Sequence, residues 1–144
     1  MEKDLSLAIK ILQEKKATCV WVKDEQSYIR FEKGIAPTLL LVDEGIDLNG
    51  FSVCDAVVGK AAAMLFSFVG VKFVHAVLIS EPAIEFLKSR NIEFTYENKC
   101  KNIINRTKTD ICPLEKATLE INDERIAVKT IRQTLENLRK NASK

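Results

Sequence analysis

Residues 51–96 carry the most regular pattern of the chain, FSVCDAVVGKAAAMLFSFVGVKFVHAVLISEPAIEFLKSRNIEFTY. The pattern predicts strands at 51–58, 73–79 and 92–96, alternating with helices at 60–68 and 81–89. Because short connections join each strand to the next helix, the three strands should run parallel to one another. The nearly continuous apolar run within the second strand is typical of a strand that is covered on both faces. The stretch therefore predicts an α/β domain with three layers, α-β-α.

The residues before this stretch add helices and an antiparallel pair of strands. Apolar residues at helical spacing predict a helix at 5–16, with Asp4 as its N-cap. Alternating apolar and polar residues then predict a hairpin with strands at 18–22 and 28–32 and a turn at 24–27. Pro37 suits the first turn of a further helix, and Gly45 suits its end. Together with residues 51–96, the pattern predicts a mixed sheet of about five strands.

The residues after this stretch are expected to form a helical extension at about 98–144. It begins with a polar stretch at 102–110, a candidate functional loop, and continues with helices at 113–119 and 124–140. No repeat or linker divides the chain, so residues 1–144 are expected to form a single domain. The last helix has enough apolar positions to cover a second copy of the chain, so a homo-oligomer is one possible assembly.

Composition excludes several classes of partner. The 144 residues include 22 Lys and Arg against 20 Asp and Glu, a net charge of +2 that marks no surface for nucleic acid or membrane. No apolar run reaches the ~18 residues of a membrane-spanning helix, and the polar N-terminus is unlike a signal peptide, so the protein is expected to be cytoplasmic. The four cysteines contain no Cys-x-x-Cys pair, which argues against a zinc ribbon and favours free thiols.

Two common kinds of catalytic site are not expected. His75 is the only histidine and lies inside an apolar strand, so it is interpreted as structural. The sequence Val58-Gly59-Lys60-Ala61 places a glycine and a lysine between a strand and a helix, but it lacks the first glycine and the hydroxyl of a phosphate-binding loop. Lys60 is therefore either a group that holds an anionic or carbonyl ligand at the helix N-terminus or a solvated lysine.

The carboxyl ends of the strands are the expected position of a pocket, because ligands bind there in α/β sheets. Gly59 and Lys60 follow one strand end, and Ser80 and Glu81 follow the next. Ser80 and Glu81 have an alternative role as the cap and first turn of a helix that begins ahead of Pro82.

A second polar cluster lies in the extension. Arg106 could bind a carboxylate or phosphate, Asp110 and Glu115 could accept hydrogen bonds, and Cys112 lies at a predicted helix start that would stabilise a thiolate. Each has an alternative role that is purely structural. In the same order, these are a solvated arginine (Arg106), a helix cap (Asp110), a carboxylate in the first helical turn (Glu115) and a packed thiol (Cys112). Cys54-Asp55 adds another thiol and carboxyl near the end of a strand.

These motifs, taken in order, resemble a known family. They are the sequences 55–63, 79–83, 104–106 and 112–115, which are similar to those of a small prokaryotic family classed as a domain of unknown function with a cytidine deaminase-like fold. The resemblance runs from the first helix to about Glu120 and implies a mixed sheet with helices on both faces.

The zinc chemistry of the deaminases is not carried over by this resemblance. In those enzymes a His or Cys at the start of one helix and the two cysteines of Pro-Cys-x-x-Cys at the start of the next bind the zinc ion, and a Glu beside the first ligand transfers protons. Here the first helix begins Gly59-Lys60-Ala61, and Ala83 and Phe86 occupy the positions of the two cysteines. No metal and no cofactor are therefore expected.

Three functions remain open, and whether the chain is an enzyme is left open with them. The first is a pocket for a small polar or nucleotide-like ligand, with or without metal-independent catalysis. The second is sulfur transfer or redox sensing through Cys54 and Cys112. The third is a structural or oligomerisation module. The candidate ligand-binding residues are Asp55, Gly59, Lys60, Ser80, Glu81, Arg106, Asp110 and Glu115, and the candidate reacting groups are Lys60, Cys54 and Cys112.

Overall fold

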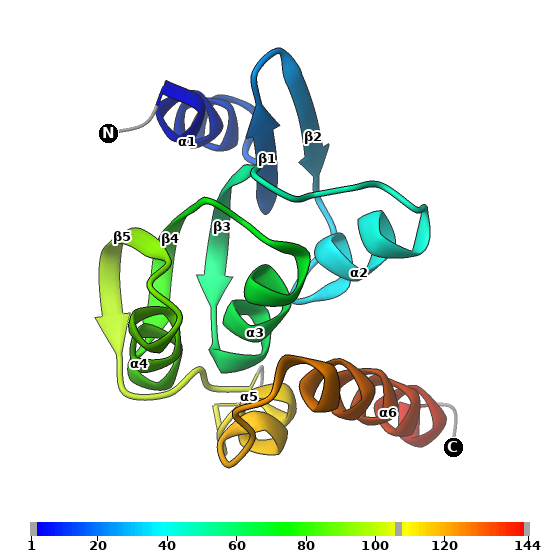
Figure 1. Ribbon diagram of the computed structural model, residues 1–144. Helices are drawn as coiled ribbons and strands as arrows, with labels where there is room; N and C mark the ends of the chain where they lie inside the picture. The colour runs from blue at the N-terminus through cyan, green and yellow to red at the C-terminus, as the bar shows by residue number, and fades with distance from the viewer. Residues whose placement is uncertain (1–2, 106–107, 143–144) are drawn as a thin grey trace.

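The computed structural model describes residues 3–105 and 108–142. Figure 1 shows the elements in chain order: α1 (Lys3–Lys15), β1 (Cys19–Lys23), β2 (Gln26–Arg30), α2 (Ala36–Asp43), β3 (Ser52–Val58), α3 (Lys60–Val69), β4 (Phe73–Ser80), α4 (Glu81–Ser89), β5 (Glu93–Cys100), α5 (Pro113–Thr118) and α6 (Glu124–Ala142). The strands form one sheet in the order β2-β1-β3-β4-β5. None of the described helices is long and apolar enough to cross a membrane.

The sheet is mixed, as predicted. Strand β1 pairs antiparallel with both β2 and β3, whereas β3, β4 and β5 run parallel to one another. The parallel part is the product of the two strand–helix–strand units in residues 51–96, and the antiparallel part is the product of the hairpin. The α/β class and the sheet of five strands are therefore confirmed.

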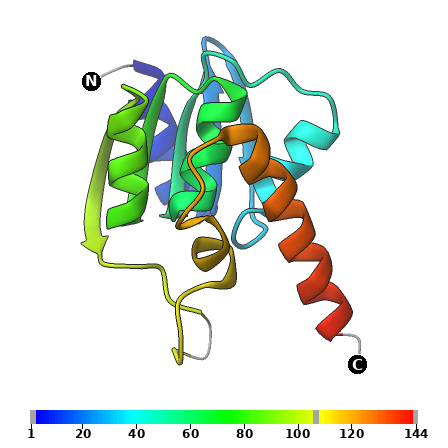
Figure 2. The ribbon, with the colours of Figure 1, turned by 60° about the horizontal axis from the view of Figure 1, so that its bottom comes forward.

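Helices cover both faces of the sheet. On one face, Ala8 and Leu12 of α1 pack with Val20 and Cys54. On the other face, α3 contributes Phe66, which packs edge to face against Trp21 with the two ring centroids 5.5 Å apart. Helix α6 lies against α3 and α5, outside this layer, as Figure 2 shows. Burial of apolar side chains on both faces explains why the central strands are almost continuously apolar.

The hairpin is tighter than predicted, and Asp4 is not an N-cap. Gln26 pairs with Lys23, so the turn consists of Asp24 and Glu25 alone, with Asp24 in the left-handed region at φ +54°. Asp4 lies within the first turn of α1, and its carboxylate accepts a hydrogen bond from the backbone N–H of Asp24 at 3.2 Å. Asp4 therefore ties the helix to the hairpin turn.

Strand β5 ends four residues later than predicted. It continues to Cys100 because its backbone keeps pairing with β4, Asn98 with Leu78 and Cys100 with Ser80. The side chains of this end are polar because β5 is an edge strand, and polar residues gave no strand signal.

Residues 101–122, here called the closing segment, connect β5 to α6 across the carboxyl ends of the parallel strands (Figure 2). In its first half Ile104 and Ile111 form an isolated antiparallel bridge, and its second half contains α5. The Cys112 N–H donates to the carbonyl of Ile103 at 2.7 Å, next to this bridge. The closing segment therefore returns the chain to the edge of the sheet where a pocket was expected.

Candidate functional site

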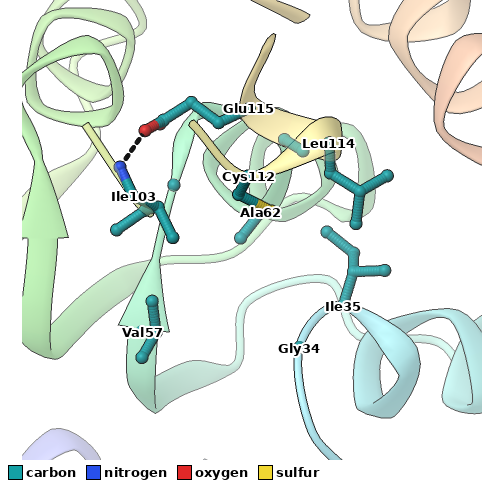
Figure 3. A pocket seen from close by; sticks show the side chains of 10 residues that line it. Gly34, Ile35, Val57, Ala62, Ile103, Cys112, Leu114 and Glu115 are labelled. Atoms are coloured by element: carbon teal, nitrogen blue, oxygen red, sulfur yellow. Dashed lines mark hydrogen bonds between the residues drawn. The ribbon is translucent and has the colours of Figure 1, made fainter. Parts of the chain in front are cut away.

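Glu115 of α5 lies at the centre of the site, with 1% of its surface exposed. Its Oε1 accepts hydrogen bonds from the backbone N–H of Lys60 at 2.9 Å and from the hydroxyl of Ser80 at 2.5 Å. Its Oε2 accepts one from the backbone N–H of Ile103, drawn as a dashed line in Figure 3. A carboxylate of the chain itself therefore occupies the N-terminus of α3, where an anionic ligand was one of the expectations.

The local sequence explains why this carboxylate fits. A Cβ atom on Gly59 would lie 3.1 Å from Glu115 Oε1 and 3.1 Å from Cγ1 of Ile103, so glycine allows the close approach. Ser80 is the N-cap of α4, accepting from the N–H of Ala83 at 3.3 Å while it donates to Glu115. The capping role considered for Ser80 and the contact with the site are therefore both present.

An apolar pocket lies beside Glu115. Its volume is about 70 Å³, and it is lined by Gly34, Ile35, Val57, Gly59, Ala61, Ala62, Ile103, Cys112, Leu114 and Glu115. Figure 3 shows Leu114 of α5 facing Ile35, which precedes α2, across this pocket. Pockets that hold small-molecule ligands usually measure about 300–1,000 Å³, so this one is too small for a nucleotide.

A larger cleft is lined by the side chain of Lys60. It measures about 440 Å³, and its other lining residues come from α4 and from the end of the closing segment: Pro82, Glu85, Phe86, Ser89, Leu119, Glu120 and Asn122. Lys60 and Pro82 lie in the first turns of α3 and α4, and from there the cleft follows α4 as far as Ser89 at its other end, with no residue of a strand in its lining. Its volume falls within the usual range of small-molecule sites.

The Lys60 side chain is buried, with 6% of the residue exposed. Its Nζ donates to the carbonyl of Leu119 at 2.7 Å and to Oδ1 of Asn122 at 3.4 Å. Burial lowers the pKa of this amine, while the carboxylates of Glu120, Glu85 and Glu115 act in the opposite direction. Among the described residues no carboxylate pairs with Nζ, so the amine has neutral oxygens as its partners.

Asp55 and Cys54 lie in the core of the sheet and line neither cavity. Burial raises the pKa of Asp55 to about 8, against which the backbone N–H groups of Val57 and Ala56 act. Burial and then the neighbouring carboxyls of Asp55 and Glu97 raise the pKa of the Cys54 thiol to about 12. A thiol with such a pKa stays protonated near neutral pH, which weighs against Cys54 as a reacting group.

The remaining predicted residues are dispersed around the site. Glu81 is exposed in the first turn of α4. Asp110 is exposed and pairs with Lys116 at 3.1 Å, while hydrogen bonds from Ile111 and Lys116 lower its pKa. Arg106 lies outside the described residues. Cys112 is half-buried at the start of α5 and lines the apolar pocket, not the cleft.

The deaminase zinc ligands have no counterparts here. Ala83 and Phe86 are buried in the core and offer no donor atom to a metal. Elsewhere in the described part of the chain, no three His, Cys, Asp or Glu side chains gather where they could hold a metal ion. His75, the single histidine, lies within hydrogen-bond distance of Thr95 and Glu97 on β5, at 2.6 and 3.1 Å.

Sequence reasoning missed the residues that complete the cleft. Glu85, Ser89, Glu120 and Asn122 line it, but each lies on an ordinary polar face of a helix or loop. One signal was available for Glu85 and Ser89, because residues four apart share one face of a helix and α4 begins at a predicted pocket. Nothing in the sequence indicated that residues 119–122 return to α4.

Comparison with known proteins was informative for the family and the fold. The family described as a domain of unknown function, TM1506 (DUF1893), matches residues 7–135. The chain is similar to the crystal structure of a DUF1893 family protein from Thermotoga maritima, with 28% identity over 95% of this chain and 92% of that chain and a TM-score of 0.81.

A lower similarity links the chain to a bifunctional protein of the same organism, a diaminohydroxyphosphoribosylaminopyrimidine deaminase/5-amino-6-(5-phosphoribosylamino)uracil reductase. The identity is 16%, the TM-score is 0.43, and the match covers 81% of this chain but 40% of that chain. No match among curated proteins was found.

Proposed function

The chain belongs to the DUF1893 family, and we propose that it binds a small, uncharged or zwitterionic polar molecule in the cleft that Lys60 lines. The observation that carries this proposal is a cleft of about 440 Å³ that runs along α4 and has the buried Lys60 in its lining. A buried amine is costly when it has no counter-ion, and only neutral oxygens accept its hydrogen bonds. A ligand with an acceptor atom facing Lys60 would offset that cost.

The charges around the cleft favour ligands without a phosphate. Glu85 and Glu120 supply two carboxylates, whereas Lys60 supplies one amine. A phosphate would meet repulsion from the carboxylates, and the N-terminus of α3, its usual partner, already holds Glu115. Hydrogen-bond donors on the ligand would instead pair with Glu85 and Glu120. A nucleobase or nucleoside meets these requirements better than a nucleotide.

The test is a binding titration followed by NMR with uracil, cytosine and adenine, their nucleosides, and the matching nucleoside monophosphates. We expect bases or nucleosides to shift the amide signals of residues 85, 119 and 122, and the monophosphates to bind at least about fivefold more weakly. Lys60→Met keeps the length of the side chain and removes its donors, so we expect a loss of about tenfold in affinity.

Lys88→Met is the matched control, because Lys88 is exposed on α4 and does not line the cleft. Its affinity should equal that of the wild type. Thermal unfolding of both variants checks that Lys60→Met is still folded, since the carbonyl of Leu119 loses its donor there. Ligands that shift only residues of the apolar pocket, or none that bind at all, would refute the proposal.

A further inference from the structure

The side chain of Lys60 donates two hydrogen bonds, as many as a neutral amine has hydrogens. A neutral amine has two hydrogens and one lone pair, whereas an ammonium group has three hydrogens. The structure provides two acceptors for Nζ, the carbonyl of Leu119 at 2.7 Å and the side-chain oxygen of Asn122 at 3.4 Å. In a neutral amine with both hydrogens bound in this way, the lone pair would remain available.

The surroundings of this amine differ from those of the exposed lysines. Lys60 is 6% exposed and is among the residues that line a cleft large enough for a small molecule. Burial also lowers its pKa, which increases the neutral fraction near pH 7. Lysines that react with carbonyl compounds are activated by this kind of desolvation.

We propose that the ε-amino group of Lys60 is a nucleophile that forms an imine with a small aldehyde or ketone bound in the cleft. This inference rests on the proposed function, because it assigns a substrate class to the same cavity. In the step, the Nζ lone pair attacks the carbonyl carbon and the C=O π bond breaks to give a carbinolamine. The C–O bond then breaks, a C=N bond forms, and both amine hydrogens leave with the carbonyl oxygen as water.

Two features of the cleft favour this step over reaction at the surface. Leu119 and Asn122 fix the two N–H bonds, so the amine is already oriented when the carbonyl compound arrives. The carboxylates of Glu85 and Glu120 line the same cleft and would stabilise the protonated imine that forms when the imine nitrogen takes up a proton from water.

The test uses salicylaldehyde as the probe, with sodium cyanoborohydride to reduce the imine to a stable secondary amine. The folded protein is treated at pH 7, and the modified lysines are identified and quantified by peptide mass spectrometry. We expect Lys60 to be modified at least about tenfold faster than Lys88, although Lys88 is exposed. Modification spread over the exposed lysines, with Lys60 at or below their rate, would overturn the inference.

Two controls separate the failure of this inference from the failure of the proposed function. Salicyl alcohol has the same ring and cannot form an imine, so NMR shifts with the alcohol report occupancy of the cleft alone. Binding of the alcohol without imine formation at Lys60 would refute the inference and leave the proposed function standing. Lys60→Arg keeps a donor at this position, and it should abolish the fast-modified site while Lys88→Met leaves it unchanged; a fast site that survives Lys60→Arg would refute the inference.

Discussion

The two cavities beside the first turn of α3 differ in size, lining and relation to the closing segment. The cavity beside residues 103–115 is apolar, measures about 70 Å³ and has Glu115 in its wall. The cavity beside residues 119–122 measures about 440 Å³ and brings together an amine and two carboxylates. Lys60 takes part in both regions, because its backbone N–H binds Glu115 and its side chain lines the larger cleft.

The difference shows how one segment can close one site and complete another. At the smaller cavity the segment supplies its own carboxylate to the N-terminus of α3, so the role of an external anion is already filled. At the larger cavity the same segment contributes the two oxygens that bind the Lys60 amine. The comparison predicts that Glu115 is important for stability, whereas the residues of the cleft are important for binding.

Glu115→Ala should have the largest effect on stability. It removes the acceptor of three donors, the N–H groups of Lys60 and Ile103 and the hydroxyl of Ser80, in a region with almost no access to water. Unsatisfied buried donors cost about 1–3 kcal/mol each, so we expect a loss of at least about 3 kcal/mol in the free energy of unfolding, measured with urea.

Glu120→Ala is the matched control for this loss. Glu120 is an exposed carboxylate of the same segment, and its removal should change stability by less than about 0.5 kcal/mol. Equal losses for the two variants would show that Glu115 does not organise the edge of the sheet.

Asp55→Asn should raise the free energy of unfolding, by an amount that depends on pH. Because the pKa of Asp55 is raised to about 8, the folded protein keeps a proton that the unfolded chain releases above about pH 4. The stability that this group contributes is present below pH 4 and is lost as the pH rises towards 8. We expect Asp55→Asn to gain about 2 kcal/mol at pH 8 and much less at pH 4.5, because the buried amide retains part of the desolvation cost.

Urea unfolding of Asp55→Asn and the wild type between pH 4.5 and pH 8.5 measures this difference. A constant difference across the range would contradict the raised pKa.

Glu115→Gln is the corresponding change at Glu115, and it should lower the stability. The new amide NH2 would face backbone N–H donors, which need an acceptor.

Gly59→Ala should have a smaller effect, a loss of about 1 kcal/mol. The new methyl group would lie 3.1 Å from both Glu115 Oε1 and Cγ1 of Ile103, so these neighbours must move by a few tenths of an ångström. The backbone itself is not strained, because Gly59 has φ −94° and ψ −178°. If the cost arises from the carboxylate, it should fall in the Glu115→Ala background, which a double-mutant cycle of unfolding energies would detect.

Cys112→Ala should have the smallest effect. Cys112 is half-buried and lines only the apolar pocket, so we expect a change of less than about 1 kcal/mol and no change in affinity for a ligand of the cleft. An affinity that falls in Cys112→Ala but not in Lys60→Met would reverse the roles assigned to the two cavities.

Much of the fold could be predicted because its signals are local. The alternation of strands and helices in residues 51–96 and the pattern of the hairpin lie within short windows of sequence. The end of β5 could not be predicted, since Asn98 and Lys99 are in the strand through backbone pairing with β4 and not through their side chains. Asp4 shows the same limit, because its partner is a backbone N–H that lies 20 residues away.

The polar residues at the strand ends could be predicted from the sequence, but their partners in the structure could not. Gly59, Lys60 and Ser80 were predicted at the strand ends, and Glu115 contacts all three. The contact between Lys60 and Glu115 spans 55 residues, and no local pattern indicates such a pair. The sequence leaves open whether Glu115 binds a ligand or other groups of the chain. The structure answers this, because three donors of the chain bind its carboxylate.

This separation along the chain also orders the maturation of the protein on the ribosome. All five strands are synthesised before Glu115, so a nascent chain can assemble its sheet while the backbone N–H of Lys60 still lacks its carboxylate. The cleft does not exist at that stage, because Leu119 and Asn122 have not yet been added. The lining of the cleft is therefore complete only after translation has passed residue 122.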